Sequence, residues 1–162
     1  MPLHIRPAVT GDAETIVRFI RELAAYEEAL HEVQATAEHI RQTLFCPEPR
    51  AFALICEDED GAIGFAVYFF NYSTWQGQYG LYLEDLYVSP QHRGKGAGQA
   101  LLQHLAQLAV ARDCGRFEWS VLDWNEPAIR VYQHLGAQPQ SEWVRYRLSG
   151  EALAQLAAHK QI

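Results

Sequence analysis

Apolar residues along the chain follow two spacings, one typical of helices and one typical of strands. Between residues 16 and 24 they recur three and four positions apart, which predicts an amphipathic helix. Thr10 and Asp12 precede this stretch and offer side-chain oxygens for its N-cap. Shorter runs rich in β-branched and aromatic residues predict strands, two of which the acidic turn at residues 57–61 joins as a hairpin. The predicted strands are Leu3–Arg6, Ala51–Cys56, Ile63–Phe70, Tyr79–Val88, Phe117–Leu122 and Trp143–Leu148.

Further helices are predicted between these strands. Residues 37–45 form a short one, and a longer one begins inside the glycine-rich run at residues 93–98. Asn125 caps the next helix, and Gly136 closes it. Ser149 can cap a terminal helix. Because strands and helices alternate along the chain, we expect an α/β or α+β fold with a mixed sheet.

The length and composition of the chain fit one globular domain. It has 162 residues, of which 49% are hydrophobic and 20% charged, and this composition excludes a disordered chain. No linker, repeat or low-complexity tract divides it, so we predict a single domain over residues 1–162. The formal net charge of -7 argues against nucleic acid as a partner and favours cationic small molecules.

The cysteines, the histidines and the lengths of the apolar runs bear on the protein's cellular location and on whether it binds a metal or a membrane. Cys46, Cys56 and Cys114 are odd in number and far apart, which favours reduced thiols and a cytoplasmic location. Neither the cysteines nor the seven histidines follow a metal-ligand spacing, so we expect no metal. The N-terminal residues lack a secretory leader, and no apolar run approaches the roughly 20 residues of a membrane span. We therefore expect no membrane partner.

The run Arg93-Gly94-Lys95-Gly96-Ala97-Gly98 lies between a predicted strand and a predicted helix. At such a junction, unpaired helix N–H groups and the positive end of the helix dipole can bind a phosphate group. Glycines let the backbone approach the anion, and Arg93 and Lys95 add positive charge to an acidic protein. The run matches neither a Walker loop nor the G-x-G-x-x-G dinucleotide fingerprint. A tight strand–helix turn without a ligand is the alternative.

The same run matches the Arg/Gln-x-x-Gly-x-Gly/Ala signature of the GNAT N-acetyltransferases, and the chain resembles that family. Other segments resemble its diamine acetyltransferase branch, and within it the thialysine N-epsilon-acetyltransferases. These segments are residues 26–27, 72–75, 82–88, 121–125 and 132–137. The resemblance implies a GNAT fold, with helices on both faces of a mixed central sheet that is splayed between the strands Tyr79–Val88 and Phe117–Leu122. It also implies a homodimer.

Acetyl-coenzyme A is the cosubstrate that the resemblance implies. Its pyrophosphate would lie on the backbone amides of the glycine run, and its pantetheine arm would lie against Asn125. The acid that protonates the departing thiolate would be Tyr132, whose helical spacing with Ala128 and Leu135 also fits a core residue. The cofactor-binding residues implied in this way are Leu86, Tyr87, Val88, Arg93, Gly94, Lys95, Gly96, Ala97, Gly98, Gln99, Asn125, Ala128 and Tyr132.

Two adjacent acids, Glu84 and Asp85, lie in a predicted strand. An amine attacks a thioester only when neutral, whereas an alkylammonium has a pKa of about 10.4, so the site must bind a cation and then accept its proton. The two side chains should point to opposite faces of the strand unless a bulge intervenes. The resemblance implies such a bulge, with a free N–H that polarises the thioester carbonyl, and implies that Glu84 is the base. A solvated strand edge is the alternative.

The substrate site is likewise implied by the resemblance. Its residues are Tyr26, Glu27, Trp75, Glu84 and Asp85. A cation over the ring of Trp75 would be attracted to it. Diamine acetyltransferases carry an acid two residues before that tryptophan, where this chain has Ser73. The loss of that carboxylate favours a short amine, such as a lysine-like or thialysine-like one, over spermine.

These observations predict an enzyme that transfers acetyl from acetyl-coenzyme A to the primary amine of a small cationic molecule by direct attack. No cysteine lies in the segments of the predicted site, which argues against a covalent thiol intermediate. Two alternatives stay open. One is an enzyme that acetylates a protein lysine or N-terminus, and the other is a protein that senses acetyl-coenzyme A without turnover.

Overall fold

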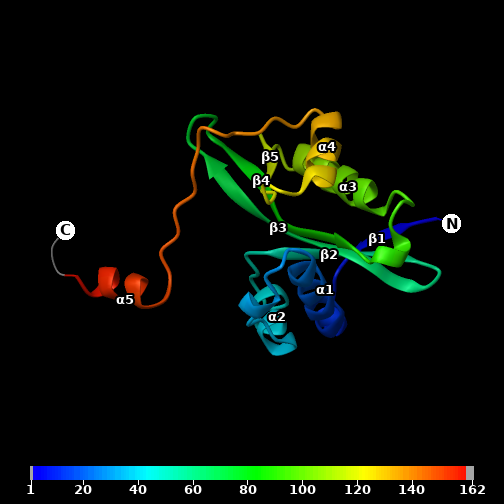
Figure 1. The fold of residues 1–162 in the computed structure, drawn as a ribbon, viewed down its shortest axis with the longest axis horizontal. Coiled ribbons are helices and arrows are strands. Elements are labelled where there is room, and N and C mark those ends of the chain that lie inside the picture. The colour runs from blue at the N-terminus through cyan, green and yellow to red at the C-terminus, as the bar shows by residue number, and fades with distance from the viewer. Residues whose placement is uncertain (1, 160–162) are drawn as a thin grey trace. The chain divides into compact units, whose positions relative to one another are not determined.

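The computed structural model describes residues 2–159, and within them a five-stranded sheet runs in the order β1-β2-β3-β4-β5 (Figure 1). Its strands are β1 His4–Pro7, β2 Phe52–Asp58, β3 Gly61–Ser73, β4 Gln78–Val88 and β5 Phe117–Trp119. Neighbouring strands from β1 to β4 are antiparallel, whereas β4 and β5 are parallel. The predicted mixed sheet is confirmed.

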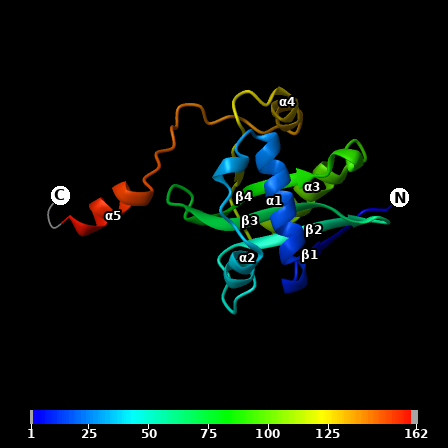
Figure 2. The same cartoon turned by 60° about the horizontal axis from the view of Figure 1, so that its bottom comes forward.

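Helices cover both faces of this sheet. The helices are α1 Ala13–Tyr26, α2 Ala37–Leu44, α3 Ala97–Ala111, α4 Glu126–His134 and α5 Gly150–Ala158. The chain divides into two units, Met1–Leu122 with the sheet and α1 to α3, and Asp123–Ile162 with α4 and α5. In the first unit, α1 and α2 lie on one face of the sheet and α3 on the other (Figures 1 and 2). The expected α/β architecture is confirmed, and the single domain over residues 1–162 stays a prediction.

An aromatic core fixes α1 on the sheet. Phe19 stacks on Phe65 of β3 with ring centroids 5.5 Å apart, and it lies 6.0 Å from the ring of Tyr87 in β4. Ile16 and Phe19 are fully buried on the face that the helical spacing predicts. Burying each such side chain stabilises the fold by about 1.5–3 kcal/mol. The last turn of α1 is thereby held close to β4.

The start of α1 differs from the prediction in one detail. Thr10–Asp12 forms a 3-10 turn, and Asp12 occupies the N-cap position without a side-chain capping bond. Its carboxylate instead accepts hydrogen bonds from the Val9 N–H at 2.8 Å and from the Arg6 guanidinium at 2.8 Å. The bond to Arg6 holds the pKa of Asp12 below its usual range. The carboxylate is engaged by the strand before the helix, not by the helix itself.

β4 and β5 separate after a short parallel pairing, which ends at the pair Leu83 and Trp119. β4 continues to Val88 beyond this point, while β5 stops. The predicted strand Phe117–Leu122 is therefore wrong at its end, because residues 120–122 form no strand. The sheet opens between β4 and β5 as the expected splay requires.

The predicted strand Trp143–Leu148 is also wrong within the part of the chain that the structure describes. These residues form no regular element, and their side chains are exposed. A strand is stabilised by its ladder of hydrogen bonds with a neighbour, and sequence alone does not supply that neighbour. Across residues 2–159, no helix is both long enough and apolar enough to cross a membrane.

Candidate active site

A bulge interrupts β4 at Glu84. In the ladder between β3 and β4, Val67 pairs with Asp85 and Tyr68 pairs with Leu83, so Glu84 has no partner in β3. The pairing of β4 with β5 also ends at Leu83. A bulged residue lies outside the ladder and re-aims the side chains around it. The bulge expected in this strand is present, and it lies where β4 and β5 separate.

Three carboxylates gather beside the bulge. Asp85 is half-buried, and burial raises its pKa to about 6, with the charges of Glu84 and Glu27 adding to the rise. Glu27, at the C-terminal end of α1, is also half-buried, and burial raises its pKa. Glu84 itself is exposed. The structure brings together the three acids that the sequence predicted around the amine. A cation among them would relieve the repulsion that Glu84 and Glu27 exert on Asp85.

Arg93 connects the last turn of α1 to β4. Its guanidinium lies 5.6 Å from the ring centroid of Tyr26 and 5.4 Å from that of Tyr87, and its Nε donates to the Val88 carbonyl at 3.0 Å. The Tyr87 hydroxyl donates to Glu22 of α1 at 3.1 Å. Cation–π contacts and a charge-assisted bond therefore hold the side chain of Arg93 toward the strand. Arg93, the first residue of the glycine run, therefore contacts α1, the helix that ends next to Glu27.

The glycine run forms an open turn at the N-terminus of α3. Gly94 and Gly96 have φ values of +79° and +85°, which favour glycine, and Gly96 is the N-cap residue. The first helical bond runs from the Ala100 N–H to the Gly96 carbonyl at 2.9 Å. The amides of residues 97–99 therefore have no acceptor within the helix. A Cβ at Gly94 or Gly96 would meet no atom within 4 Å. This turn has the open space and the N–H donors that a pyrophosphate group requires.

The first turn of α3 packs close to β4. A Cβ on Gly98 would lie 3.8 Å from Cδ2 of Leu86, an ordinary contact distance, so the helix lies directly against this strand. Ala97 is buried under the turn, while Lys95 and Gln99 are exposed. The exposed ammonium of Lys95 adds positive charge at the mouth of the turn.

The turn between β3 and β4 carries exposed aromatic rings. Trp75 is 81% exposed, and the rings of Tyr72 and Tyr79 meet edge to face at 5.3 Å. Ser73 is buried, and its Oγ accepts a hydrogen bond from the Gln76 N–H at 3.2 Å. The serine that stands where diamine acetyltransferases carry an acid therefore has a structural role in this turn.

Asn125, Ala128 and Tyr132 lie in the second unit, on and before α4. The predicted N-cap is confirmed, because the Ala128 N–H donates to Oδ1 of Asn125 at 3.5 Å. Gly136 follows the helix with a φ of +91°, as its predicted closing role requires. Tyr132 is half-buried on α4. The parts of Asn125 and Tyr132 in binding and catalysis stay predictions.

Two residues near the site were not singled out from the sequence. Glu22 accepts the hydrogen bond of the Tyr87 hydroxyl. It lies four positions before Tyr26 and therefore on the same face of α1, so helical spacing could have identified it from the sequence. His92 closes the 3-10 helix Pro90–His92 and is buried directly before the glycine run. No spacing in the sequence pointed to it, because its partners lie more than thirty positions away.

Comparison with known proteins places the chain in a family. Residues 18–137 match the acetyltransferase (GNAT) family. A thialysine N-epsilon-acetyltransferase of Mus musculus is 39% identical over 165 residues, which cover 95% of this chain and 96% of that protein. An L-ornithine N5-acetyltransferase of Arabidopsis thaliana is 43% identical over 195 residues, covering 93% of this chain and 86% of that protein.

Solved structures share the same fold. An integron cassette protein from the mobile metagenome of V. cholerae superimposes with a TM-score of 0.81 at 26% identity, covering 98% of this chain and 99% of that chain. An aminoglycoside acetyltransferase from a soil metagenome superimposes with a TM-score of 0.74 at 17% identity, covering 91% of this chain. Because the family match spans most of the sequence and relatives above 30% identity align over nearly their whole length, the chain belongs to the acetyltransferase (GNAT) family.

Proposed function

We propose that this acetyltransferase modifies the primary amine of a small cationic molecule with a lysine-, thialysine- or ornithine-like side chain. The observation that carries the proposal is the group of three carboxylates beside the bulge, Glu27, Glu84 and Asp85. Relatives named for thialysine and for ornithine support the same class of substrate. A compact acidic site of this kind favours a short amine with a single cationic group at the reacting end.

GNAT acetyltransferases use acetyl-coenzyme A, which supplies the thioester carbonyl and the thiolate that leaves. We assign its pyrophosphate to the turn at Gly94 and Gly96 and to the amides of residues 97–99. The fit rests on the open space above both glycines and on the N–H groups at the start of α3. Leu86, Tyr87 and Val88, in the half of β4 that β5 leaves unpaired, would line the path of the pantetheine arm, with Asn125 and Ala128 as further contacts.

The amine must lose a proton before it attacks. Glu84 is our candidate base because it is exposed at the bulge, where an incoming amine can reach it. Asp85 and Glu27 would hold the cation before the transfer, and its charge offsets their repulsion. A backbone N–H freed by the bulge would polarise the thioester carbonyl. Tyr132 would give its hydroxyl proton to the leaving thiolate.

The aromatic turn between β3 and β4 limits the substrate. Trp75 offers an exposed ring to a cation. Ser73 brings no charge to this end of the site, since it is buried and bonded within the turn. Ser73 therefore does not supply a carboxylate that a long polycation such as spermine could use, which favours shorter amines.

The proposal is tested by thiol release from acetyl-coenzyme A with a panel of thialysine, lysine, ornithine, spermidine, spermine and a lysine-containing peptide. We expect the highest kcat/KM with the amino-acid amines. Preference for the peptide would support a protein acetyltransferase instead, and binding of acetyl-coenzyme A without thiol release for any amine would support a sensor. A kcat/KM for spermine well above that for lysine would overturn the substrate class.

The same assay on two variants tests the assigned roles. Glu84→Gln should lower kcat by about 10²-fold, and the loss should shrink at higher pH and with thialysine, whose sulfur lowers the pKa of the amine. Tyr132→Phe keeps the ring and should lower kcat by a similar factor without that relief, because a tyrosine acid works only while protonated. Parallel pH profiles for the two variants would mean that the roles are wrongly assigned.

We also place the protein in the cytoplasm as a homodimer. Cys46, Cys56 and Cys114 are free thiols, which supports a reducing compartment. The exposed apolar side chains at residues 143–148 support a second copy as the partner that covers them. A small amine and acetyl-coenzyme A complete the set of partners that we propose. We propose neither nucleic acid nor a metal as a ligand.

A further inference from the structure

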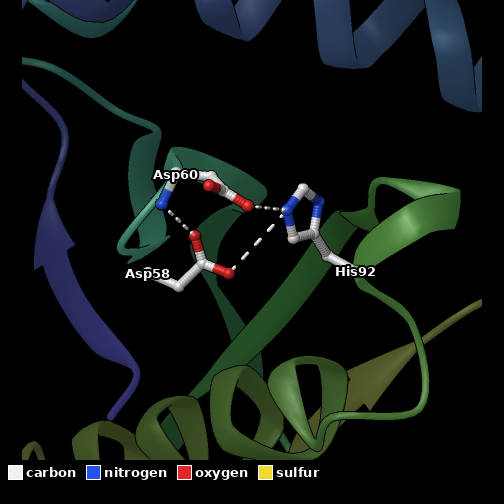
Figure 3. A group of neighbouring side chains, drawn as sticks. All are labelled: Asp58, Asp60 and His92. Atoms are coloured by element: carbon white, nitrogen blue, oxygen red, sulfur yellow. Dashed lines mark hydrogen bonds and ion pairs between the residues drawn. The ribbon is translucent and has the colours of Figure 1, made fainter. Parts of the chain in front are cut away.

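A buried histidine joins the β2–β3 turn to the segment before the glycine run. Nε2 of His92 lies 3.1 Å from Oδ2 of Asp60 and 3.8 Å from Oδ2 of Asp58 (Figure 3). His92 is 8% exposed, whereas the side chain of Asp60 is 66% exposed. The turn that carries the two aspartates and the helix that ends at His92 are thus held together by one imidazole.

Both sides of this contact are fixed by further bonds. In the turn, the Asp60 N–H donates to Oδ1 of Asp58 at 2.7 Å, so Asp58 shapes the turn and Asp60 is left to meet the histidine. On the other side, the His92 N–H donates to the Ser89 carbonyl at 2.9 Å, and the Ser89 N–H donates to the Ile63 carbonyl at 2.8 Å. The 3-10 helix Pro90–His92 is therefore tied to β3 by its backbone and to the turn by the His92 ring.

The same three side chains have ligand atoms within 4.8 Å of one another, a spacing that could suit a metal ion. The histidine argues against that use. A metal-bound histidine commonly donates its second ring N–H to an acceptor, but Nδ1 of His92 is buried without a hydrogen-bond partner among the described residues. A ring that donates its Nε2–H to the Asp60 carboxylate accounts for the contacts without an ion.

We infer that His92 is a positioning residue for the coenzyme loop, Arg93–Gly98, which begins at the next position in the chain. The inference rests on the proposed function of that loop in binding acetyl-coenzyme A. Gly94 and Gly96 make the loop costly to order, because glycine loses more backbone freedom than any other residue. The bond from His92 to Asp60 fixes the start of the loop before the ligand arrives, which strengthens binding by pre-organisation. Arg93 fixes the same start toward β4.

Because coenzyme A is an anion, two variants that each remove one negative charge from the β2–β3 turn can be compared to test the role of the His92–Asp60 bond. Removing any carboxylate from the turn should strengthen binding of an anion slightly, through the lost repulsion. Removing Asp60 should instead weaken it if the bond to His92 positions the loop. Asp60→Ala and Glu59→Ala each delete one exposed negative charge from the same turn, and Asp60 alone of the two contacts His92. Asp60→Ala is therefore expected to weaken binding, whereas Glu59→Ala is expected to leave it unchanged or to strengthen it slightly.

The experiment is calorimetric titration of acetyl-coenzyme A into the native protein and five variants, four single and one double. His92→Phe and Asp60→Ala should each raise Kd about three- to tenfold, the range for one lost hydrogen bond. Glu59→Ala should leave Kd unchanged or lower it. His92→Gln, which keeps an amide N–H near the position of Nε2, should restore most of the affinity. A variant that combines His92→Phe with Asp60→Ala should bind no worse than either alone, because both remove the same bond.

Steady-state kinetics separates positioning from a general loss of stability. The KM for acetyl-coenzyme A should rise with Kd in His92→Phe and Asp60→Ala, while kcat at saturating acetyl-coenzyme A stays within about twofold. If the native protein binds but all variants bind equally well, or if the two deletions are additive, the inference is wrong and the proposed function stands. If the native protein fails to bind acetyl-coenzyme A, the proposed function fails and the inference falls with it.

Discussion

At the scale of single residues, the acids of the site show what a sequence can and cannot reveal. The adjacent pair Glu84 and Asp85 stood out because an amine acetyltransferase needs carboxylates, and the family resemblance added Glu27. Which of the pair is buried could not be predicted from alternation along a strand. The bulge at Glu84 decides it, and the bulge arises from pairing with β3. As a result Asp85 is partly buried, and burial raises its pKa strongly.

This raised pKa predicts how stability depends on pH. The pKa of Asp85 is about 6 in the folded protein and 3.8 in its ordinary range, so the folded state binds the proton more tightly than the unfolded state. The stability that Asp85 contributes is therefore complete below about pH 4 and is lost as the pH rises to about 6. Asp85→Asn is neutral at every pH. At pH 7.5 this variant should be more stable than the native protein by roughly 2–3 kcal/mol.

Urea unfolding at pH 4 and pH 7.5 measures the effect of Asp85→Asn, and the difference from the native protein should vanish near pH 4. Glu59→Gln, at an exposed acid of the β2–β3 turn, should show no such gain at either pH. Acetyl transfer by Asp85→Asn should fall although the fold is more stable, because a carboxylate that we propose to bind the cation is gone. A variant with unchanged stability at pH 7.5 would show that burial does not raise the pKa of Asp85 in the folded protein.

At the scale of elements, the boundaries of β4, the glycine run and α3 could be predicted from the sequence to within a few residues. The predicted strand Tyr79–Val88 is observed as Gln78–Val88, and the helix begins at Ala97, inside the predicted run. Both boundaries follow from local chemistry. β4 ends two residues before Pro90, which has no N–H to donate to a ladder, and Gly96 in a left-handed conformation is the N-cap of α3. β5 was predicted too long because its end is set by where β4 stops pairing with it, which is a long-range property.

The glycine at the start of α3 gives a prediction for this element. Gly96 has a φ of +85°, and open space surrounds the position of its Cβ. Gly96→Val should lower the free energy of unfolding by about 1–2 kcal/mol because a branched side chain is strained there. It should also fill the turn and abolish stabilisation by acetyl-coenzyme A, which is about 2.7 kcal/mol at a hundredfold excess over Kd.

Thermal unfolding with and without acetyl-coenzyme A checks this prediction. Gly150→Val is the matched control, since Gly150 has a φ of +58° and equally open surroundings at the start of α5. Both variants should unfold at lower temperature than the native protein. Only Gly96→Val should lose the increase in Tm that acetyl-coenzyme A causes. An equal increase in both variants would contradict the assignment of the glycine turn as the phosphate site.

At the scale of the whole molecule, the segment at residues 143–148 has a strand-like sequence without a strand. Val144, Tyr146 and Leu148 alternate with two arginines, a period of two that is typical of a strand. The apolar side chains are exposed in the single chain, with Tyr146 at 93%. Apolar side chains and backbone groups exposed together mark a surface that pairs with another chain. We expect a second copy of this protein to supply that pairing.

The oligomeric state tests this expectation. Light scattering after gel filtration should give about twice the 18.4 kDa mass of one chain for the native protein. Tyr146→Asn places a polar side chain on the apolar row and should shift the mass toward that of the monomer as the protein is diluted. Arg145→Asn introduces the same residue on the opposite row and should leave the dimer intact, because only the apolar row is expected to be covered. A native protein that runs as a monomer at every concentration would overturn the expected dimer.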